Sequence, residues 1–190
     1  MEHEREMHAS RWPVTAILTL ALSGAPLAVA DAQLRASIGA AAGATIPMSG
    51  FGDRTNTGYH VMVTLGVHAP MVPLSLRIEG MYNEFDYNSD GGALFRSANR
   101  TARVLGATAN GILTSSGILG LYVIGGIGVY QRTEAEPVLG GTVSSNNFGG
   151  NIGGGLRFEL SGFSAYGEVR YHWVGDSDVR LIPITFGLTF

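Results

Sequence analysis

The stretch that decides the fold is the end of the chain, Ile182-Pro-Ile-Thr-Phe-Gly-Leu-Thr-Phe190. Large apolar residues occupy every second position, and Pro, Thr and Gly stand between them. A period of two places the apolar set on one face of a β-strand and the other set on the opposite face. At the end of a soluble protein, a bare strand of this kind would invite edge-to-edge pairing. A closed barrel avoids that problem, because its last strand pairs with its first.

The start of the chain carries a second signal. Residues 12–30 form a near-continuous apolar run that ends in Ala28-Val29-Ala30, a small-x-small cleavage site. The run is short and wrongly flanked for a convincing spanning helix and fits a secretory signal peptide, so we predict that residues 1–30 are removed by cleavage after Ala30. The acidic residues before the run are unusual for such a peptide, and translation from Met7 would give a more typical start. A buried N-terminal helix is the alternative.

Composition narrows the class of protein. The 190 residues include no cysteine and carry a formal net charge of −3, which argues against nucleic acid as a partner. Without cysteine there is no disulfide framework and no thiolate metal site. Glycine occupies 28 positions, scattered through apolar runs that a helix would tolerate poorly. After the expected signal no apolar run reaches the length of about eighteen residues that a spanning helix needs.

Eight alternating segments follow the expected signal. Their predicted bounds are 33–44, 59–69, 74–87, 101–113, 118–132, 148–160, 164–174 and 182–190. The facing of 101–113 is ambiguous; we favour Arg103 and Leu105 outward and Asn110 inward. The connections alternate between long and short, which is typical of barrels with short periplasmic turns and long outer loops.

The sequence therefore predicts an all-β fold, a closed eight-stranded antiparallel up-and-down transmembrane β-barrel over residues 31–190. Surface loops are expected at roughly 45–58, 87–100 and 133–147.

Three segments carry a family resemblance: Leu121-Tyr-Val-Ile-Gly-Gly-Ile-Gly-Val-Tyr130, Leu76-Arg-Ile-Glu-Gly-Met-Tyr82 and Gly167-Glu-Val-Arg-Tyr171. Together with the signal, the strand count and the terminal Phe190, they make the chain resemble the small bacterial outer-membrane β-barrels. That family is similar to the transmembrane domain of outer-membrane protein A and to opacity-type proteins. The resemblance implies export through the periplasm to the outer membrane of a Gram-negative-type bacterium. It also implies two partners, outer-membrane lipid and a barrel-assembly machinery that reads Phe190, and leaves any surface partner open.

Six charged residues are expected inside the barrel, opposite the apolar face of their strands: Arg77, Glu79, Arg157, Glu159, Glu168 and Arg170. They form three i, i+2 pairs, and the members of each pair share a face. An unpaired charge in a narrow interior costs several kcal/mol, so we predict one belt of ion pairs at a similar height in the lumen. Such a belt would plug the barrel and fix its strand register. A gate or a polar pathway for small solutes is the alternative.

Catalysis finds little support in the sequence. Some eight-stranded barrels modify lipid A with a Ser and a nearby His, but the same-face neighbours of His172 are Arg170 and Val174. We interpret His60 as an outer-rim residue and His68 as a periplasmic one. Triads can assemble from distant strands, so a lipid-modifying enzyme stays open beside a narrow channel and the favoured structural or surface-interaction role. A soluble lipocalin-like binder would need an apolar interior. No cofactor and no metal are expected.

Overall fold

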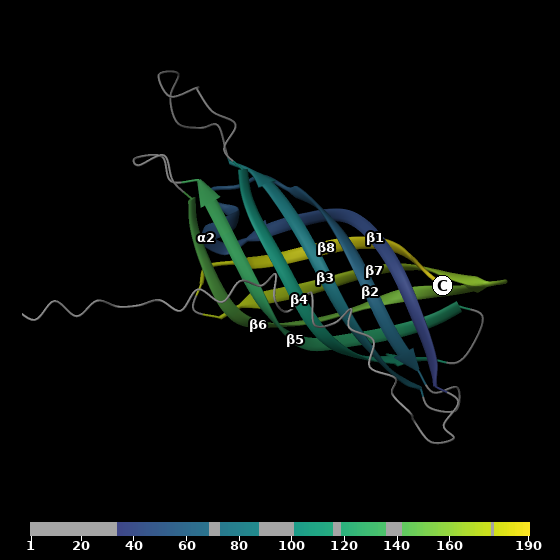
Figure 1. The fold of residues 1–190 in the computed structure, drawn as a ribbon. Helices are drawn as coiled ribbons and strands as arrows, with labels where there is room; N and C mark the ends of the chain where they lie inside the picture. Colours follow the sequence, from purple (N-terminus) through teal and green to yellow (C-terminus); the bar gives the residue numbers. More distant parts are fainter. Residues whose placement is uncertain (1–33, 69–72, 88–100, 116–118, 136–141, 176) are drawn as a thin grey trace, which may run out of the picture. The chain divides into compact units, whose positions relative to one another are not determined.

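The computed structural model describes residues 34–68, 73–87, 101–115, 119–135, 142–175 and 177–190 (Figure 1). These residues form eight strands and one short helix: β1 (Arg35–Met48), α2 (Ser49–Gly52), β2 (Gly58–His68), β3 (Leu74–Asp86), β4 (Thr101–Thr114), β5 (Leu119–Ala135), β6 (Thr142–Leu160), β7 (Phe163–Val174) and β8 (Arg180–Thr189). Each strand pairs antiparallel with the next, and β1 also pairs with β8. The predicted closed eight-stranded up-and-down barrel is confirmed.

Closure uses the terminal stretch from which the fold was predicted. Phe186 of β8 pairs with Ala42 of β1. At the very end, the Ile38 amide donates to the Phe190 carbonyl at 3.0 Å, and the Phe190 amide donates to the Ile38 carbonyl at 2.8 Å. The last strand therefore has a partner on each side and leaves no open edge at this end of the chain.

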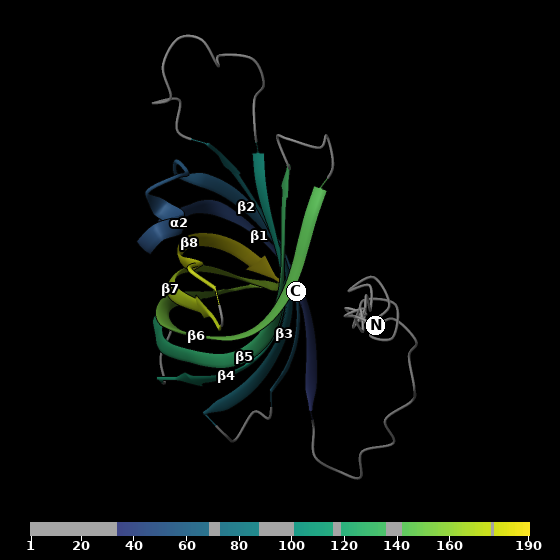
Figure 2. The same ribbon diagram turned by 90° about the vertical axis from the view of Figure 1, so that its left-hand side faces the viewer.

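The two ends of the barrel differ in their connections. Residues 69–73, 115–118 and 161–162 link strands at the end where the chain terminates, which we call the short-turn end. The connections after β1, β3, β5 and β7 lie at the opposite, long-loop end, which faces the viewer in Figure 2.

The outer face of the barrel is apolar. Residues of β3 and β4 alternate along the strand between more exposed and more buried positions, and large apolar side chains dominate the exposed set of the barrel, with Phe148 80% exposed. On β4, Arg103 and Leu105 point outward and Asn110 is buried, as favoured from the sequence. An apolar surface that encircles a barrel in this way suits contact with lipid.

No helix in the part of the chain that the structure describes is long and apolar enough to cross a membrane.

Glycine makes room in the lumen for tyrosine. Tyr122 pairs directly with Gly155 across β5 and β6, and Tyr166 pairs with Gly187 across β7 and β8. A Cβ atom added to Gly155 would lie 2.5 Å from the Tyr122 hydroxyl oxygen, and one added to Gly187 would lie 2.5 Å from Tyr166 Cζ. The hydroxyl ends of the two rings therefore occupy the space that a side chain at either glycine would need.

Two of the expected surface loops differ from the structure. β1 continues to Met48 and is followed by α2, so 45–58 is partly strand and partly helix. β5 continues to Ala135 and β6 begins at Thr142, so most of 133–147 is a strand hairpin. A strand can continue past an apolar band wherever a neighbour satisfies its backbone, and here β5 and β6 do so for each other. Most of 87–100 lies outside the described residues.

Candidate functional site

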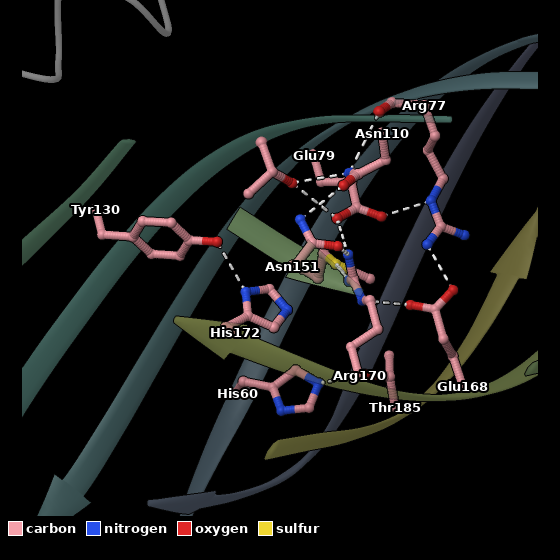
Figure 3. Close-up of polar contacts among 12 residues, drawn as sticks. His60, Arg77, Glu79, Asn110, Tyr130, Asn151, Glu168, Arg170, His172 and Thr185 are labelled. Carbon is pink, nitrogen blue, oxygen red and sulfur yellow. Dashed lines mark hydrogen bonds and ion pairs between the residues drawn. The ribbon is translucent and has the colours of Figure 1, made fainter. Parts of the chain in front are cut away.

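The centre of the lumen holds a closed ring of four charged side chains, Arg77 and Glu79 from β3 and Glu168 and Arg170 from β7 (Figure 3). We call these four residues the charge ring. Arg77 contacts Glu79 (Nε to Oε1, 2.5 Å) and Glu168 (Nη2 to Oε2, 2.6 Å). Arg170 contacts Glu79 (Nη1 to Oε2, 2.6 Å) and Glu168 (Nε to Oε1, 2.7 Å). Each arginine thus bridges both carboxylates, and the ring is neutral overall.

Strand geometry explains why these residues meet. Within each strand the two members are two residues apart and so point to the same side of the sheet. β3 and β7 are not neighbours in the barrel order, so their inward side chains approach each other across the lumen. None of the four side chains is more than 11% exposed. In such surroundings, removing one partner leaves a buried charge unpaired and typically lowers the free energy of unfolding by about 3–5 kcal/mol.

Neutral polar groups donate further hydrogen bonds to the two carboxylates. The Thr108 hydroxyl donates to Glu79 at 3.0 Å, and the Tyr122 hydroxyl donates to Glu168 at 2.7 Å. Asn151 donates its amide to the Asn110 side-chain oxygen at 2.8 Å, and Asn110 in turn donates to Thr108. The charge ring is therefore embedded in a wider polar network that draws on β3 to β7.

The other two residues of the expected belt lie elsewhere. Arg157 and Glu159 pair with each other at 2.7 Å near the β6–β7 turn, and their side chains are 35% and 50% exposed. The two-residue turn fixes this outcome: it pairs Arg157 with Tyr166, and it places Gly155 opposite Glu168. The expected belt of six thus differs from the observed ring of four. Counting the register outward from the turn would have separated the two groups.

His60 is a buried lumen residue, so the interpretation of it as a rim residue was wrong. Its Nδ1 lies 2.9 Å from the Thr45 hydroxyl, and its Nε2 lies 3.0 Å from the Thr185 hydroxyl. The Thr45 hydroxyl donates to the Asn83 side-chain oxygen, so it accepts from His60, and this assigns the ring proton to Nδ1. The error arose because β1 and its following helix extend the barrel beyond this level.

His172 is also fully buried, and its described partner is the Tyr130 hydroxyl, 2.9 Å from Nδ1. The two rings meet edge to face with centroids 5.9 Å apart. His68 instead lines a cavity of about 60 Å³ at the short-turn end, beside Arg77 and Tyr166. That volume is enough for one or two water molecules.

An apolar cluster lies above the polar network at the long-loop end, and we call it the apolar cap. Its members are Phe51, Phe85, Ala102, Val104, Tyr130, Val174, Val179 and Leu181. Phe51 comes from α2, is completely buried, and packs edge to face on Phe85 at a centroid distance of 5.2 Å. The Arg132 guanidinium lies over the Phe51 ring at 5.0 Å. One weak signal in the sequence points to this cap, an aromatic residue in an otherwise polar loop.

Polar contacts surround the apolar cap. The Thr55 hydroxyl donates to the Phe51 carbonyl at 2.7 Å, and Thr55 forms an isolated β-bridge with Tyr87. The Tyr87 hydroxyl donates to Glu134, which also pairs with Arg132. Burial raises the pKa of Tyr87 to about 12, and the hydrogen bond to Glu134 adds to the rise. These contacts tie the first outer connection to β3 and β5.

Comparison with known proteins places this geometry in a family. The family model for the outer membrane protein beta-barrel domain matches residues 14–190. No functionally curated protein matches the sequence. Among solved structures, neisserial surface protein A has a TM-score of 0.64 at 12% identity, with 82% of this chain and 97% of that chain covered. A major outer membrane protein of Thermus thermophilus has a TM-score of 0.60 at 14% identity, with 83% and 98% covered.

The attachment invasion locus protein Ail of Yersinia pestis has a TM-score of 0.53 at 14% identity, with 82% of this chain and 97% of that chain covered. At such identities these structures establish the fold alone, whereas the family model spans most of the chain. The chain belongs to the outer-membrane protein β-barrel family.

Proposed function

We propose that this protein is a closed scaffold in the outer membrane, with a lumen blocked at two levels and a surface-interaction role at its long-loop end. The observation that carries this proposal is that the charge ring and the apolar cap lie in the same lumen, one above the other. An eight-stranded barrel is just wide enough for its own side chains. We infer that these two layers of described residues leave no wide aqueous path for a solute.

The orientation of the chain in the membrane is inferred from the general architecture of outer-membrane barrels. Barrels of this class turn their short connections to the periplasm and their long loops outward. We therefore place the short-turn end in the periplasm. We also propose a signal peptide cleaved after Ala30, with Ala28 and Ala30 as the small residues of the site, and recognition of Phe190 by the barrel-assembly machinery.

The surface partner is a separate question. A protein of this fold, Ail of Yersinia pestis, has been crystallised with the heparin analogue sucrose octasulfate. We do not transfer a sulfated ligand to this chain, because a likeness at 13% identity shows the fold alone. Of the described arginines at the long-loop end, Arg54 and Arg180 donate to backbone carbonyls, and two others pair with carboxylates. Arg103 pairs with Glu84, and Arg132 pairs with Glu134.

Planar-bilayer recording separates a scaffold from a channel. The purified protein, reconstituted after heat-modifiable gel mobility has verified its folding, should give no sustained single-channel conductance. Stepwise conductance that scales with salt concentration would overturn the scaffold and support the narrow channel.

Lipid analysis tests the enzymatic alternative. His172 has a tyrosine hydroxyl as its described partner, so we propose no acyl-transfer or hydrolytic role. Mass spectra of lipid A from cells with and without the protein should be identical. A mass difference equal to one acyl chain would show that the barrel modifies lipid.

A further inference from the structure

Among the described strands, one stretch of β6 has a neighbour on one side only. β6 pairs with β5 from Thr142, opposite Ala135, down to Phe158. On its other side, the register with β7 begins only at Gly149. Just beyond it, the Phe148 carbonyl accepts from the Gly175 amide at 2.7 Å. We call residues 142–147 the free edge, and in Figure 2 this end of β6 (bright green) projects away from β7, beside β5.

Strand geometry identifies the backbone groups that face outward from the free edge. Backbone groups of successive residues alternate between the two sides of a strand. Since the Phe148 carbonyl faces β7, Asn146 and Ser144 turn their N–H and C=O groups to the same open side. Ser145 and Asn147 turn theirs towards β5. Within the described residues, no backbone hydrogen bond reaches Asn146 or Ser144 from the open side.

Among the described residues, nothing gives the free edge the usual protection against strand pairing. Natural edges carry lysine, proline, an inward charge or a covering segment. The sequence from Thr142 to Phe148 is Thr-Val-Ser-Ser-Asn-Asn-Phe, without charge and without proline. Ser144, Ser145 and Asn146 are exposed. By contrast, the outer end of β1 pairs with β8 as far as Met48 and is followed by α2.

We propose that the free edge binds an extended segment of another protein as an added strand, antiparallel to β6. The inference rests on the proposed surface-interaction role, since it places the partner at the long-loop end. Main-chain hydrogen bonds from Asn146 and Ser144 supply the recognition, which is the usual mode of β-strand addition. Strand addition requires a partner segment that is extended and free of proline. Because the edge carries no charge and offers no ion pairs, the partner segment is not strongly charged.

A second copy of this chain fits the free edge poorly. Two barrels in one membrane share the same orientation, so their β6 strands run in the same direction across the bilayer. Antiparallel pairing between the two edges is therefore not available, and parallel pairing is the less stable arrangement. A foreign segment has no such restriction.

The test uses the folded protein in lipid nanodiscs and peptides selected against it from a random-sequence library. Binding should protect the amides of Ser144 and Asn146 from hydrogen exchange, measured residue by residue by NMR. Asn146→Pro should weaken peptide binding by about tenfold or more, because it removes an outward donor and blocks strand addition. The same change spares the ladder with β5, since the Asn146 amide faces away from that strand.

Asn146→Thr is the matched control: it changes the side chain, keeps the amide, and should retain binding. Three results would overturn the proposal: a library that yields no binder, binders equally tight on Asn146→Pro, or binders that leave both amides unprotected. Protection that rises with protein concentration and without peptide would also overturn it, by showing that a second copy covers the edge. Conductance is independent of these readouts, so failure of the closed scaffold and failure of the free edge are distinguishable.

Discussion

The charge ring and the apolar cap occupy the same lumen and are held together by opposite means. The ring consists of four side chains from two strands, held by ion pairs of 2.5 to 2.7 Å. The cap collects one residue from α2 and others from the outer ends of several strands, held by packing. Ion pairs demand a particular geometry, whereas apolar packing demands only volume and exclusion of water. The ring therefore specifies how β3 and β7 face each other, and the cap packs above them at the long-loop end.

The largest effect should come from opening the charge ring. Glu168→Ala leaves two arginines short of one carboxylate inside the barrel, and should lower the free energy of unfolding by about 3–5 kcal/mol. Urea titration of the barrel in lipid vesicles measures this change, and the temperature of the heat-modifiable gel shift should fall with it. Glu159→Ala is the matched control, because its half-exposed pair with Arg157 should contribute at most about 1 kcal/mol. Equal losses in the two variants would contradict a structural ring.

Removing the central residue of the cap should cost somewhat less. Phe51→Ala empties a fully buried site, for which about 3 kcal/mol is a typical loss. Phe51→Leu keeps most of the volume and should cost less than about 1.5 kcal/mol. The same urea titration compares the two variants. If Phe51→Ala has no effect, the first outer connection does not seal the barrel.

A double substitution sharpens the contrast between geometry and volume. Arg170→Met combined with Glu79→Leu removes one charge of each sign and leaves Arg77 and Glu168 paired at 2.6 Å. The double variant should be more stable than either single variant by about 1–3 kcal/mol, since no uncompensated charge remains. A complete double-mutant cycle measures the coupling. Strictly additive losses would mean that the two residues act independently.

The smallest effect concerns Gly155, which lies against the Tyr122 side chain that contacts the charge ring. Gly155→Ala brings a methyl group within 2.5 Å of the Tyr122 hydroxyl oxygen, which itself donates to Glu168. Overpacking of this kind costs about 1–3 kcal/mol. Gly125→Ala is the control, because its nearest neighbour would be the Asn151 carbonyl oxygen at 3.6 Å, an ordinary contact. The unfolding midpoints in urea should separate the two alanine variants.

The strands of the barrel and their lipid-facing sides could be predicted from the sequence, whereas many contacts between side chains in the lumen could not. The period of two reports directly which face meets lipid, so even the facing of β4, with Arg103 outward and Asn110 inward, could be predicted. The pairs within Arg77/Glu79 and Glu168/Arg170 were visible because charge stands out on an inward face. Their partners across the lumen were not visible, since contacts between non-neighbouring strands depend on a register that alternation alone leaves open.

The apolar cap and His60 escaped prediction for a related reason. Phe51 sits among glycine and polar residues, a pattern that favours a loop, and its packing partners come from strand ends far along the chain. Because Phe51 packs inside the barrel, the lumen extends farther towards the long-loop end than expected, and His60 lies in its interior. The free edge of β6 is a property of unequal strand ends, which boundaries inferred from alternation do not resolve.

Side-specific thiol labelling tests most directly whether the lumen is blocked at both levels. The chain contains no cysteine, so each single cysteine substitution introduces the one thiol that the reagent can label. Ser37→Cys lines the cavity at the short-turn end, and Thr45→Cys lies between the charge ring and the apolar cap, at the level of His60. A small membrane-impermeant reagent should label Ser37→Cys from the short-turn side only and should not label folded Thr45→Cys from either side. Rapid labelling of folded Thr45→Cys from either side would contradict a lumen sealed at two levels.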